Sequence, residues 1–408
     1  MLTPEYLQRI TEGAEEISSS LHRTIMDMII ERIMKRLGRG EDYLLTQTDR
    51  WQIQVLQESG ELLEDIQKEI ADKTKLQQKE IKDAFVDAGI NTLKWDDAVY
   101  IAAGLTPTAL MQSPTMLRIL ERDYLATAGE WNNFTRTTAL DAQRTVLNQM
   151  DNAYHLVSTG AVSYTQAVRD VINNITEVGL KVNYPTGYRM SIESATMMIV
   201  RTGVGQAAAD ISMKRMEEMN WDTVLVSAHL GARTGNGGMN PGNHLWWQGR
   251  FYSRSGKDKR FPDFVKTTGF GTGEGLCGWN CRHSFGSGDG VNNPYEDKKI
   301  TLADNHKVEE LQKKQRAQER RIRDTKRKIQ NLQTAVDNCK DDKARFELQN
   351  MLDRKAHTLK LQNKRYSAFC EENDLREYAE RLKVARWDRK QAMKSAAAAR
   401  RYESAKKS

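Results

Sequence analysis

Apolar residues recur every three or four positions through most of the first 220 residues. The first such run contains Leu7, Ile10, Ala14, Ile17, Leu21, Ile25, Met28 and Ile29. Thr3 can cap a helix, Pro4 suits the first helical position, and Gly38 offers a stop. The pattern therefore predicts one amphipathic helix over about residues 3–38.

The same spacing predicts four further helices in this half of the chain. They cover about residues 48–88, 114–157, 164–178 and 191–219. The stretches GRGED, AGLTPTALMQSPT, STG and YPTG, which separate the helices, contain ordinary turn residues. Residues 1–220 are therefore predicted to form a helical domain.

The period changes from 3.6 to 2 in the stretch NWDTVLVSAHLGAR, where Thr223, Leu225 and Ser227 alternate with their neighbours. Of the 27 glycines in the chain, 15 lie between residues 231 and 290. This density predicts a small Gly-rich α+β module over residues 221–297, built from turns and short strands. Such a module has little regular backbone structure, so its stability requires aromatic packing, a metal ion or docking on a neighbour.

The helical period returns after residue 298 as a thin apolar stripe among charged residues. The stripe consists of Val308, Leu311, Ile322, Ile329, Leu332 and Val336. The stretch DNCKDDK is the predicted reversal, so residues 298–380 are expected to form a charged helical hairpin or coiled coil. Residues 381–408 form a basic tail, which is either a basic helix or a disordered tail that folds on binding. The predicted fold class is thus mainly α, with long N-terminal helices, the small module and a C-terminal charged hairpin.

Charge is distributed unevenly along the chain. The formal net charge is +7, yet residues 307–408 contain 29 Lys and Arg against 16 Asp and Glu, a net charge of +13, which leaves −6 for residues 1–306. This asymmetry indicates an interaction arm whose partner is nucleic acid or an acidic protein surface. The candidate nucleic-acid contacts are Arg386, Arg389, Lys390, Lys394, Arg400 and Arg401.

Composition excludes several classes of protein. Hydrophobic residues make up 39% and charged residues 29% of the chain, which suits long solvated helices better than one compact globule. No apolar run approaches the roughly 18 residues that span a bilayer, and the acidic start opposes a signal peptide. Four cysteines are too few for a disulfide framework, so a reducing compartment is expected.

The Gly-rich module concentrates the residues that could bind a metal. Cys277, Cys281 and His283, with His244 as a fourth ligand, could bind a structural zinc ion, although the spacing CxxxCxH differs from the usual CxxC. The alternative is that the cysteines are small buried residues and the histidines bond to the backbone. From the residues alone the two interpretations are equally favoured, so the expected cofactor is either none or one zinc ion.

Other motifs in the module favour packing over chemistry. The glycines of RTGNGGMNPGN and TTGFGTGEG are not followed by the GK[ST] of a phosphate-binding loop, so we reject nucleotide binding. In HLWWQGRFY, Trp247 and Phe251 are expected to be core residues. In GLCGWNCRHSF, Trp279 and Cys281 are expected to be buried, with Arg282 or His283 bonding to the backbone.

Four segments of the module, in their order, carry a family resemblance: VSAHLGAR, HLWWQGRFY, TTGFGTGEGL and GWNCRHSF. Together they resemble the Mu F-like head morphogenesis module of tailed bacteriophages, in the branch called phage minor capsid protein 2. One departure is the stretch TGNGGMNPGN, which looks like an insertion between Arg233 and His244. The matching motif positions are His229, Gly231, Ala232, Arg233, His244, Trp247, Gln248, Gly249, Thr268, Gly269, Gly271, Gly275, Leu276, Asn280, Cys281, Arg282 and His283.

The resemblance implies a structural component of the virion rather than an enzyme. It implies incorporation in few copies during head assembly, in the host cytoplasm, with the phage portal or major capsid protein as partner. The helical domain would dock on that partner, and the basic tail would contact packaged DNA.

Three alternatives stay open at this point. One is a zinc-dependent hydrolase or nuclease that uses His229, His244 and His283, and another is a thiol enzyme that uses Cys281. Both enzymes lack a recognisable acidic general base in the sequence. The third is a secreted effector that uses the module as a carrier.

Overall fold

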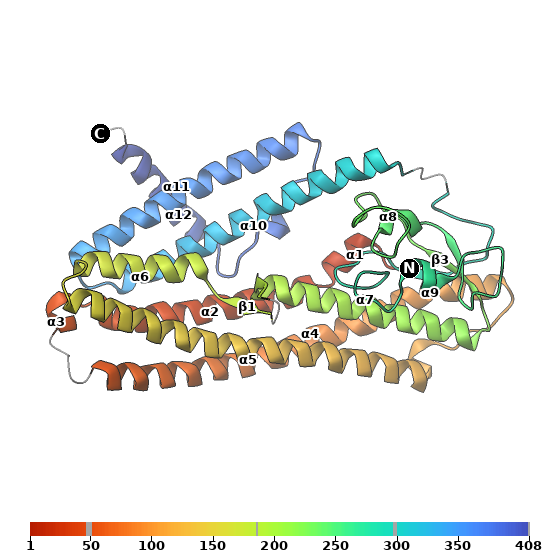
Figure 1. Cartoon of the computed structure of the whole chain (residues 1–408), viewed down its shortest axis with the longest axis horizontal. Coiled ribbons are helices and arrows are strands. Elements are labelled where there is room, and N and C mark those ends of the chain that lie inside the picture. The colour runs from red at the N-terminus through yellow and green to blue at the C-terminus, as the bar shows by residue number, and fades with distance from the viewer. Residues whose placement is uncertain (46–50, 185–186, 297–299, 407–408) are drawn as a thin grey trace. The chain divides into compact units, whose positions relative to one another are not determined.

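The computed structural model describes residues 1–45, 51–184, 187–296 and 300–406 (Figure 1). Most of these residues are helical, and the few strands are short and antiparallel. The fold class predicted from the sequence, mainly α with a small α+β module, is therefore confirmed. No helix in the described part of the chain is long and apolar enough to span a membrane.

The chain forms two compact units, and each is assembled from three separate stretches. Unit 1 comprises Met1–Glu15, Lys75–Asn132 and Ser194–Lys313, and unit 2 comprises Glu16–Thr74, Asn133–Glu193 and Lys314–Ser408. Long helices contribute residues to both units. The division into segments 1–220, 221–297, 298–380 and 381–408 stays a prediction.

Unit 1 contains a helical part and the Gly-rich module. The helical part consists of α1 (Pro4–Arg9), the second part of α4 (Trp51–Ala102), η1 (Leu110–Gln112), the first part of α5 (Pro114–Ser158), most of α7 (Ile192–Glu218) and the start of α10 (Leu302–Asn338). Its core includes Leu7, Phe85, Met116, Val204 and Ile211, all almost fully buried. Four of these helices thus share one apolar core.

The start of the chain differs from the predicted single helix over residues 3–38. Thr3 caps α1 by accepting a hydrogen bond from the Tyr6 N–H at 3.1 Å, as the sequence predicts. However, α1 ends at Arg9, and α2 (Glu12–Leu37) begins after a turn at which the Thr11 hydroxyl donates to the Gln8 carbonyl at 2.8 Å. A threonine hydroxyl that bonds to the backbone in this way competes with helix continuation.

Helix α4 extends beyond the predicted end at Ala88. Gly89 lies inside the helix, where an added Cβ would come within 3.0 Å of Ile211 Cδ1 on α7. The glycine therefore permits close packing of two helices instead of ending one of them. The predicted beginning of this helix, near Thr48, lies outside the described residues.

The module is built on a three-stranded sheet in the order β4-β3-β5. Its elements are β3 (Thr223–Val226), α8 (His244–Trp247), β4 (Phe251–Ser253), α9 (Phe264–Thr268) and β5 (Phe285–Ser287). β3 lies in the centre and pairs antiparallel with both neighbours, with Val224 opposite Tyr252 and Ser287. The alternation that predicts a strand at residue 223 is thus confirmed.

Aromatic side chains form most of the module's core. Trp247, Tyr252 and Phe264 are fully buried, and the Phe264 and Phe285 rings meet edge to face at 4.8 Å. The core role predicted for Trp247 is confirmed, whereas Phe251 is only partly buried. The prediction for Trp279 is wrong, because this side chain is 64% exposed and its ring covers Gly273 instead of entering the core.

Unit 2 is a helical assembly with one β-hairpin. It contains most of α2, α3 (Glu41–Leu45), the first part of α4, the second part of α5, α6 (Tyr164–Val178), β1 (Lys181–Asn183), β2 (Arg189–Ser191), most of α10, α11 (Asp342–Glu372), η2 (Ala379–Leu382) and α12 (Arg389–Ala405). Helix α6 has the bounds that the sequence predicts. The predicted reversal DNCKDDK separates α10 from α11, and Asp341 caps α11 by accepting from the Ala344 N–H at 2.8 Å.

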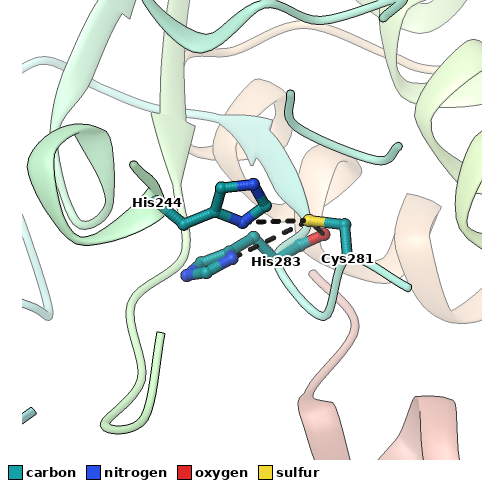
Figure 2. Close-up of side chains that lie close together, drawn as sticks. All are labelled: His244, Cys281 and His283. Carbon is teal, nitrogen blue, oxygen red and sulfur yellow. Dashed lines mark hydrogen bonds between the residues drawn. The ribbon is translucent and has the colours of Figure 1, made fainter. Parts of the chain in front are cut away.

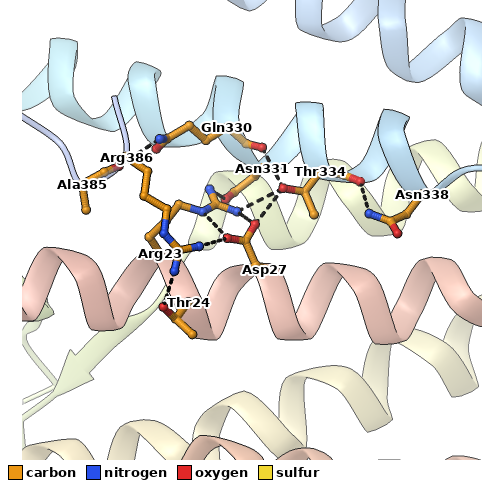
Figure 3. Close-up of polar contacts among 9 residues, drawn as sticks. All are labelled: Arg23, Thr24, Asp27, Gln330, Asn331, Thr334, Asn338, Ala385 and Arg386. Carbon is orange, nitrogen blue, oxygen red and sulfur yellow. Dashed lines mark hydrogen bonds and ion pairs between the residues drawn. The ribbon is translucent and has the colours of Figure 1, made fainter. Parts of the chain in front are cut away.

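Most of α10 and all of α11, the helices of the predicted hairpin, pack within unit 2 and do not form an isolated arm. Ile322, Ile329 and Leu332 of the predicted apolar stripe are fully buried. Polar contacts also join α10 to α2, since Arg23 donates to Asn331 Oδ1 at 2.7 Å and also pairs with Asp27 (Figure 3). A stripe that would suit an isolated arm instead packs within unit 2.

Candidate metal-binding site

Three predicted ligands come together in the module of unit 1. The Cys281 Sγ lies 3.7 Å from His244 Nδ1 and 3.8 Å from His283 Nδ1 (Figure 2). These three atoms all lie within 4.8 Å of one another. The side chains are almost inaccessible to solvent, with exposed fractions of 2% for His244, 8% for Cys281 and 3% for His283.

Local backbone structure brings the three residues together. His244 is the first residue of α8, and its N–H donates to the Arg233 carbonyl at 2.8 Å. Cys281 and His283 lie in the loop that leads into β5, whose start is fixed by hydrogen bonds between Ser227 and Ser284. The pairing of β5 with β3 therefore brings Cys281 and His283 close to His244, although His244 is distant from them in sequence.

A tight turn before Cys281 depends on glycine. An added Cβ at Gly275 or Gly278 would overlap the carbonyl oxygens of Gly269 and Gly273, respectively. Cys277 and Asn280 both adopt positive φ angles, +59° and +54°, which are unusual for residues with a side chain. The turn thus reverses the chain within a few residues and directs Cys281 inward.

Hydrogen bonds on the far side of each imidazole fix its orientation. His283 Nε2 lies 2.8 Å from Gln248 Oε1, and the same oxygen accepts from the His229 N–H at 3.0 Å. Gln248 Oε1 is an acceptor, so His283 Nε2 must donate and its Nδ1 must carry the lone pair. His283 therefore presents an unprotonated nitrogen to Cys281.

His244 is held by a main-chain carbonyl. Its Nε2 lies 2.8 Å from the Glu274 carbonyl oxygen and also 2.8 Å from Arg233 Nη2. Arg233 donates to the same carbonyl at 3.1 Å. When Nε2–H donates to Glu274, the Nδ1 lone pair of His244 also faces the sulfur.

Burial decides the charge states in this cluster. It lowers the pKa of His244 to about 4 and lowers that of His283 well below its ordinary value, with the nearby Arg233 adding to both effects. Burial also raises the pKa of Cys281, and backbone hydrogen bonds offset only part of that increase. Both histidines are therefore neutral, which is the state that binds metals. The thiol is not activated, as a thiol enzyme would require.

The remaining predicted ligand, Cys277, lies beside the cluster. Its Sγ is 3.8 Å from the His283 carbonyl oxygen, and the group of three converging ligand atoms does not include it. Its side chain packs in the core of the module. No carboxylate belongs to the cluster among the described residues.

The remaining motif residues surround the cluster or shape its loops. The His229 ring stacks on the His283 ring with centroids 4.3 Å apart, and Trp247 meets His283 edge to face at 4.9 Å. Asn280 Oδ1 accepts from Arg201 at 3.4 Å, and Arg282 is partly buried. The motif glycines Gly249, Gly269 and Gly271 all have positive φ angles, which explains the residue type at those turns.

Sequence reasoning missed two parts of this arrangement. Gln248 was expected as a motif residue, but not as the support of His283. Glu274 contributes a backbone carbonyl, which leaves no signal in the side-chain pattern.

Comparison with known proteins then identifies the family. The family model of phage minor capsid protein 2 matches residues 2–369, nearly the whole chain. The chain belongs to the phage minor capsid protein 2 family. It is therefore a structural protein of a bacteriophage head, as the motif order suggests, and its place is the virion. No curated protein and no solved structure matches this minor capsid protein.

The family match includes His244, Cys281 and His283 but ends before the basic helix. It stops at residue 369, so α12 of this minor capsid protein lies outside it. The candidate DNA contacts Arg386 to Arg401 therefore lie outside the family match. The likeness to the Mu F-like module stays a prediction.

The candidate DNA contacts fall into two groups. Arg386 pairs with Asp27 at 3.0 Å (Figure 3), and Arg401 pairs with Asp353 at 2.7 Å. The other four, Arg389, Lys390, Lys394 and Arg400, are exposed on α12. The sequence left open a basic helix or a disordered tail for residues 381–408. The structure contains a basic helix, α12 (Arg389–Ala405).

Proposed function

We propose that this structural head protein contacts packaged DNA through the exposed face of α12, from a position at the portal vertex or on the capsid interior. The observation that carries the DNA contact is the arrangement of bases on α12. Arg389, Lys390, Lys394 and Arg400 fall within roughly 140° of the helix circumference at 3.6 residues per turn. Such a face can follow a phosphate backbone.

The opposite face of α12 is occupied by packing within unit 2. Ser395, Ala398 and Ala399 are buried, and Lys360 of α11 pairs with Glu403 at 2.7 Å. Small buried side chains let α12 lie close to its neighbour, while the long basic side chains extend to solvent. The helix is thus presented as a fixed basic surface, which would bind without first having to fold.

Family membership supports docking of this chain on another protein of the phage head. A minor capsid protein must contact other head proteins, and the portal protein and the major capsid protein are the two candidates. Purified heads and proheads should contain the chain, and cross-linking should join it to one of these two proteins. Absence of the chain from both particles would contradict the head location.

Charge removal on α12 tests the DNA contact. Replacing Arg389, Lys390, Lys394 and Arg400 with glutamine should weaken binding to duplex DNA. If all four bases contact phosphates, the slope of log affinity against log salt should fall in magnitude by about 3 to 4, since each contact contributes about 0.9. Unchanged affinity and slope would contradict the proposal.

A matched control removes the same charge elsewhere. Lys68, Lys75, Lys79 and Lys82 are exposed on α4. Their replacement with glutamine lowers the net charge equally, so it should leave the salt slope nearly unchanged. An equal loss in both variants would indicate a general charge effect and not a contact through α12.

A further inference from the structure

The side chains of His244, Cys281 and His283 bring three potential metal ligands together at one buried point. His283 Nδ1 presents a lone pair to Cys281 Sγ at 3.8 Å, because its Nε2–H donates to Gln248 Oε1, and His244 Nδ1 lies 3.7 Å from the same sulfur. A single cation at the centre would satisfy all three atoms.

We propose that His244 Nδ1, His283 Nδ1 and Cys281 Sγ bind one zinc ion. Two imidazoles and one thiolate form a borderline-soft ligand set, which suits zinc better than magnesium or calcium. The proposal is independent of the DNA contact, because α12 belongs to the other compact unit. It assigns a ligand role to three residues that unit 1 already holds together.

The supporting hydrogen bonds are those of a metal site. Histidines that bind metals usually donate their other ring N–H to a carbonyl or carboxylate, which fixes the ring. Here His283 donates to Gln248 Oε1 at 2.8 Å, and His244 Nε2 lies 2.8 Å from both the Glu274 carbonyl oxygen and Arg233 Nη2. The oxygen of Gln248 is in turn held by the His229 N–H. Both rings are thus aimed at the same centre by residues outside the ligand set.

Burial adds a second reason for a bound cation. Cys281 belongs to the core cluster of the module with Trp247 and Leu276, and the His244 and His283 side chains are also buried. A module of turns and three short strands also gains stability from a crosslink between distant segments, here residue 244 with residues 281 and 283. Zinc would therefore crosslink these segments of the module, and three protein ligands leave one coordination position for a further ligand.

Cys277 provides a matched control for the three ligands. It is a buried cysteine in the same turn, but it does not belong to the converging group. We infer that it is a packing residue, so Cys277→Ala should retain the metal. Cys281→Ser and His283→Ala should lose it.

Metal content and cobalt substitution test the assignment. The full chain, purified without chelator, should contain one equivalent of zinc by elemental mass spectrometry. Cobalt(II) exchanged into the site should give the visible bands of a tetrahedral centre and a near-ultraviolet thiolate-to-metal band. Cys281→Ser should abolish the thiolate band, whereas Cys277→Ala should leave it intact.

Several outcomes would overturn the assignment. If the purified protein contains no metal and binds no cobalt, the residues do not form a metal site. If it contains copper in place of zinc, the assignment of zinc is wrong. Equal loss of metal in Cys277→Ala and Cys281→Ser would contradict the three-ligand set. Circular dichroism of each variant shows whether the helices persist, and Gln248→Ala, which keeps all three ligands, should reduce zinc affinity by about 10-fold or more.

Discussion

The carboxylate of Asp96 accepts a hydrogen bond from the Ser287 N–H at 2.7 Å. The same side chain accepts from the Ser212 hydroxyl at 2.6 Å, and it is fully buried. It therefore joins α4 to α7 and to β5, the strand that follows Cys281 and His283. Sequence patterns gave no signal for this role, because Asp96 looks like a solvated residue on a polar helix.

Removal of the Asp96 side chain should destabilise unit 1. Asp96→Ala leaves the Ser287 N–H and the Ser212 hydroxyl without their acceptor, so the free energy of unfolding should fall by about 2–4 kcal/mol. Hydrogen exchange of peptides from β5 and α7 measures this loss locally. Unchanged protection in these peptides would contradict the anchoring role.

The pH dependence of unit 1 follows from the same residue. Burial raises the pKa of Asp96 from 3.8 to about 6, against the hydrogen bonds from Ser212 and Ser287. The folded state then holds the proton more tightly than the unfolded state, so stability should fall as pH rises from about 4 to 6. Asp96→Asn should flatten this dependence, because the amide cannot ionise. Equal slopes in the variant and the wild type would contradict the assignment.

Glu193 makes unit 2 sensitive to acid. Its carboxylate is buried and lies 2.9 Å from His22 Nδ1 and 3.0 Å from Arg327. Burial alone would raise the pKa of Glu193, but Arg327 and His22 outweigh it and hold the pKa well below its ordinary value. The stabilisation is therefore present above about pH 4.5 and lost as pH falls further. Denaturation midpoints at pH 7 and pH 4 should show this loss, and Glu193→Gln should reduce the difference.

Breaking the pair should cost more than removing it. Arg327→Gln leaves Glu193 buried without its main cationic partner, so unit 2 should lose about 3–5 kcal/mol at pH 7. The double variant Glu193→Gln with Arg327→Gln should lose less than Arg327→Gln alone. A larger loss in the double variant would contradict this account.

Arg386 should act in folding and not in DNA binding. Its φ angle is +57°, and its guanidinium binds Asp27 at 3.0 Å and Thr24 at 2.9 Å. Because the side chain is 56% exposed, the ion pair should contribute no more than about 1 kcal/mol. Arg386→Ala should therefore lower the denaturation midpoint slightly and leave DNA affinity unchanged.

Two further variants serve as comparisons for Arg386→Ala, one for the backbone conformation and one for DNA affinity. Arg386→Gly also loses the ion pair but relieves the unfavourable positive φ angle, so it should be more stable than Arg386→Ala. Lys390→Ala should show the opposite profile, with lower DNA affinity and unchanged stability. Equal loss of DNA affinity in Arg386→Ala and Lys390→Ala would assign Arg386 to the DNA contact.

The sequence by itself determined the local elements and the family. Periodicity located α6 from Tyr164 to Val178, and the polar run DNCKDDK located the reversal before α11, because both depend on neighbours within a few residues. The order of the motifs pointed to the phage minor capsid protein 2 family for a different reason, since an order of motifs along the chain can be recognised without knowledge of contacts. The residue types and their spacing made His244, Cys281 and His283 candidate metal ligands, with packing residues as the equally favoured alternative.

Only the tertiary structure decided which of these residues meet and which point away. Trp279 was expected in the core yet is exposed, and Cys277, a candidate ligand, is not one of the three converging ligand residues. Gly89 resembles a helix stop, but it permits contact with Ile211 from a helix more than a hundred residues away. Arg386 and Arg401 resemble free bases until Asp27 and Asp353 are placed beside them. Each outcome depends on contacts between distant segments, and the free energy of such contacts is invisible in a local pattern of residue types.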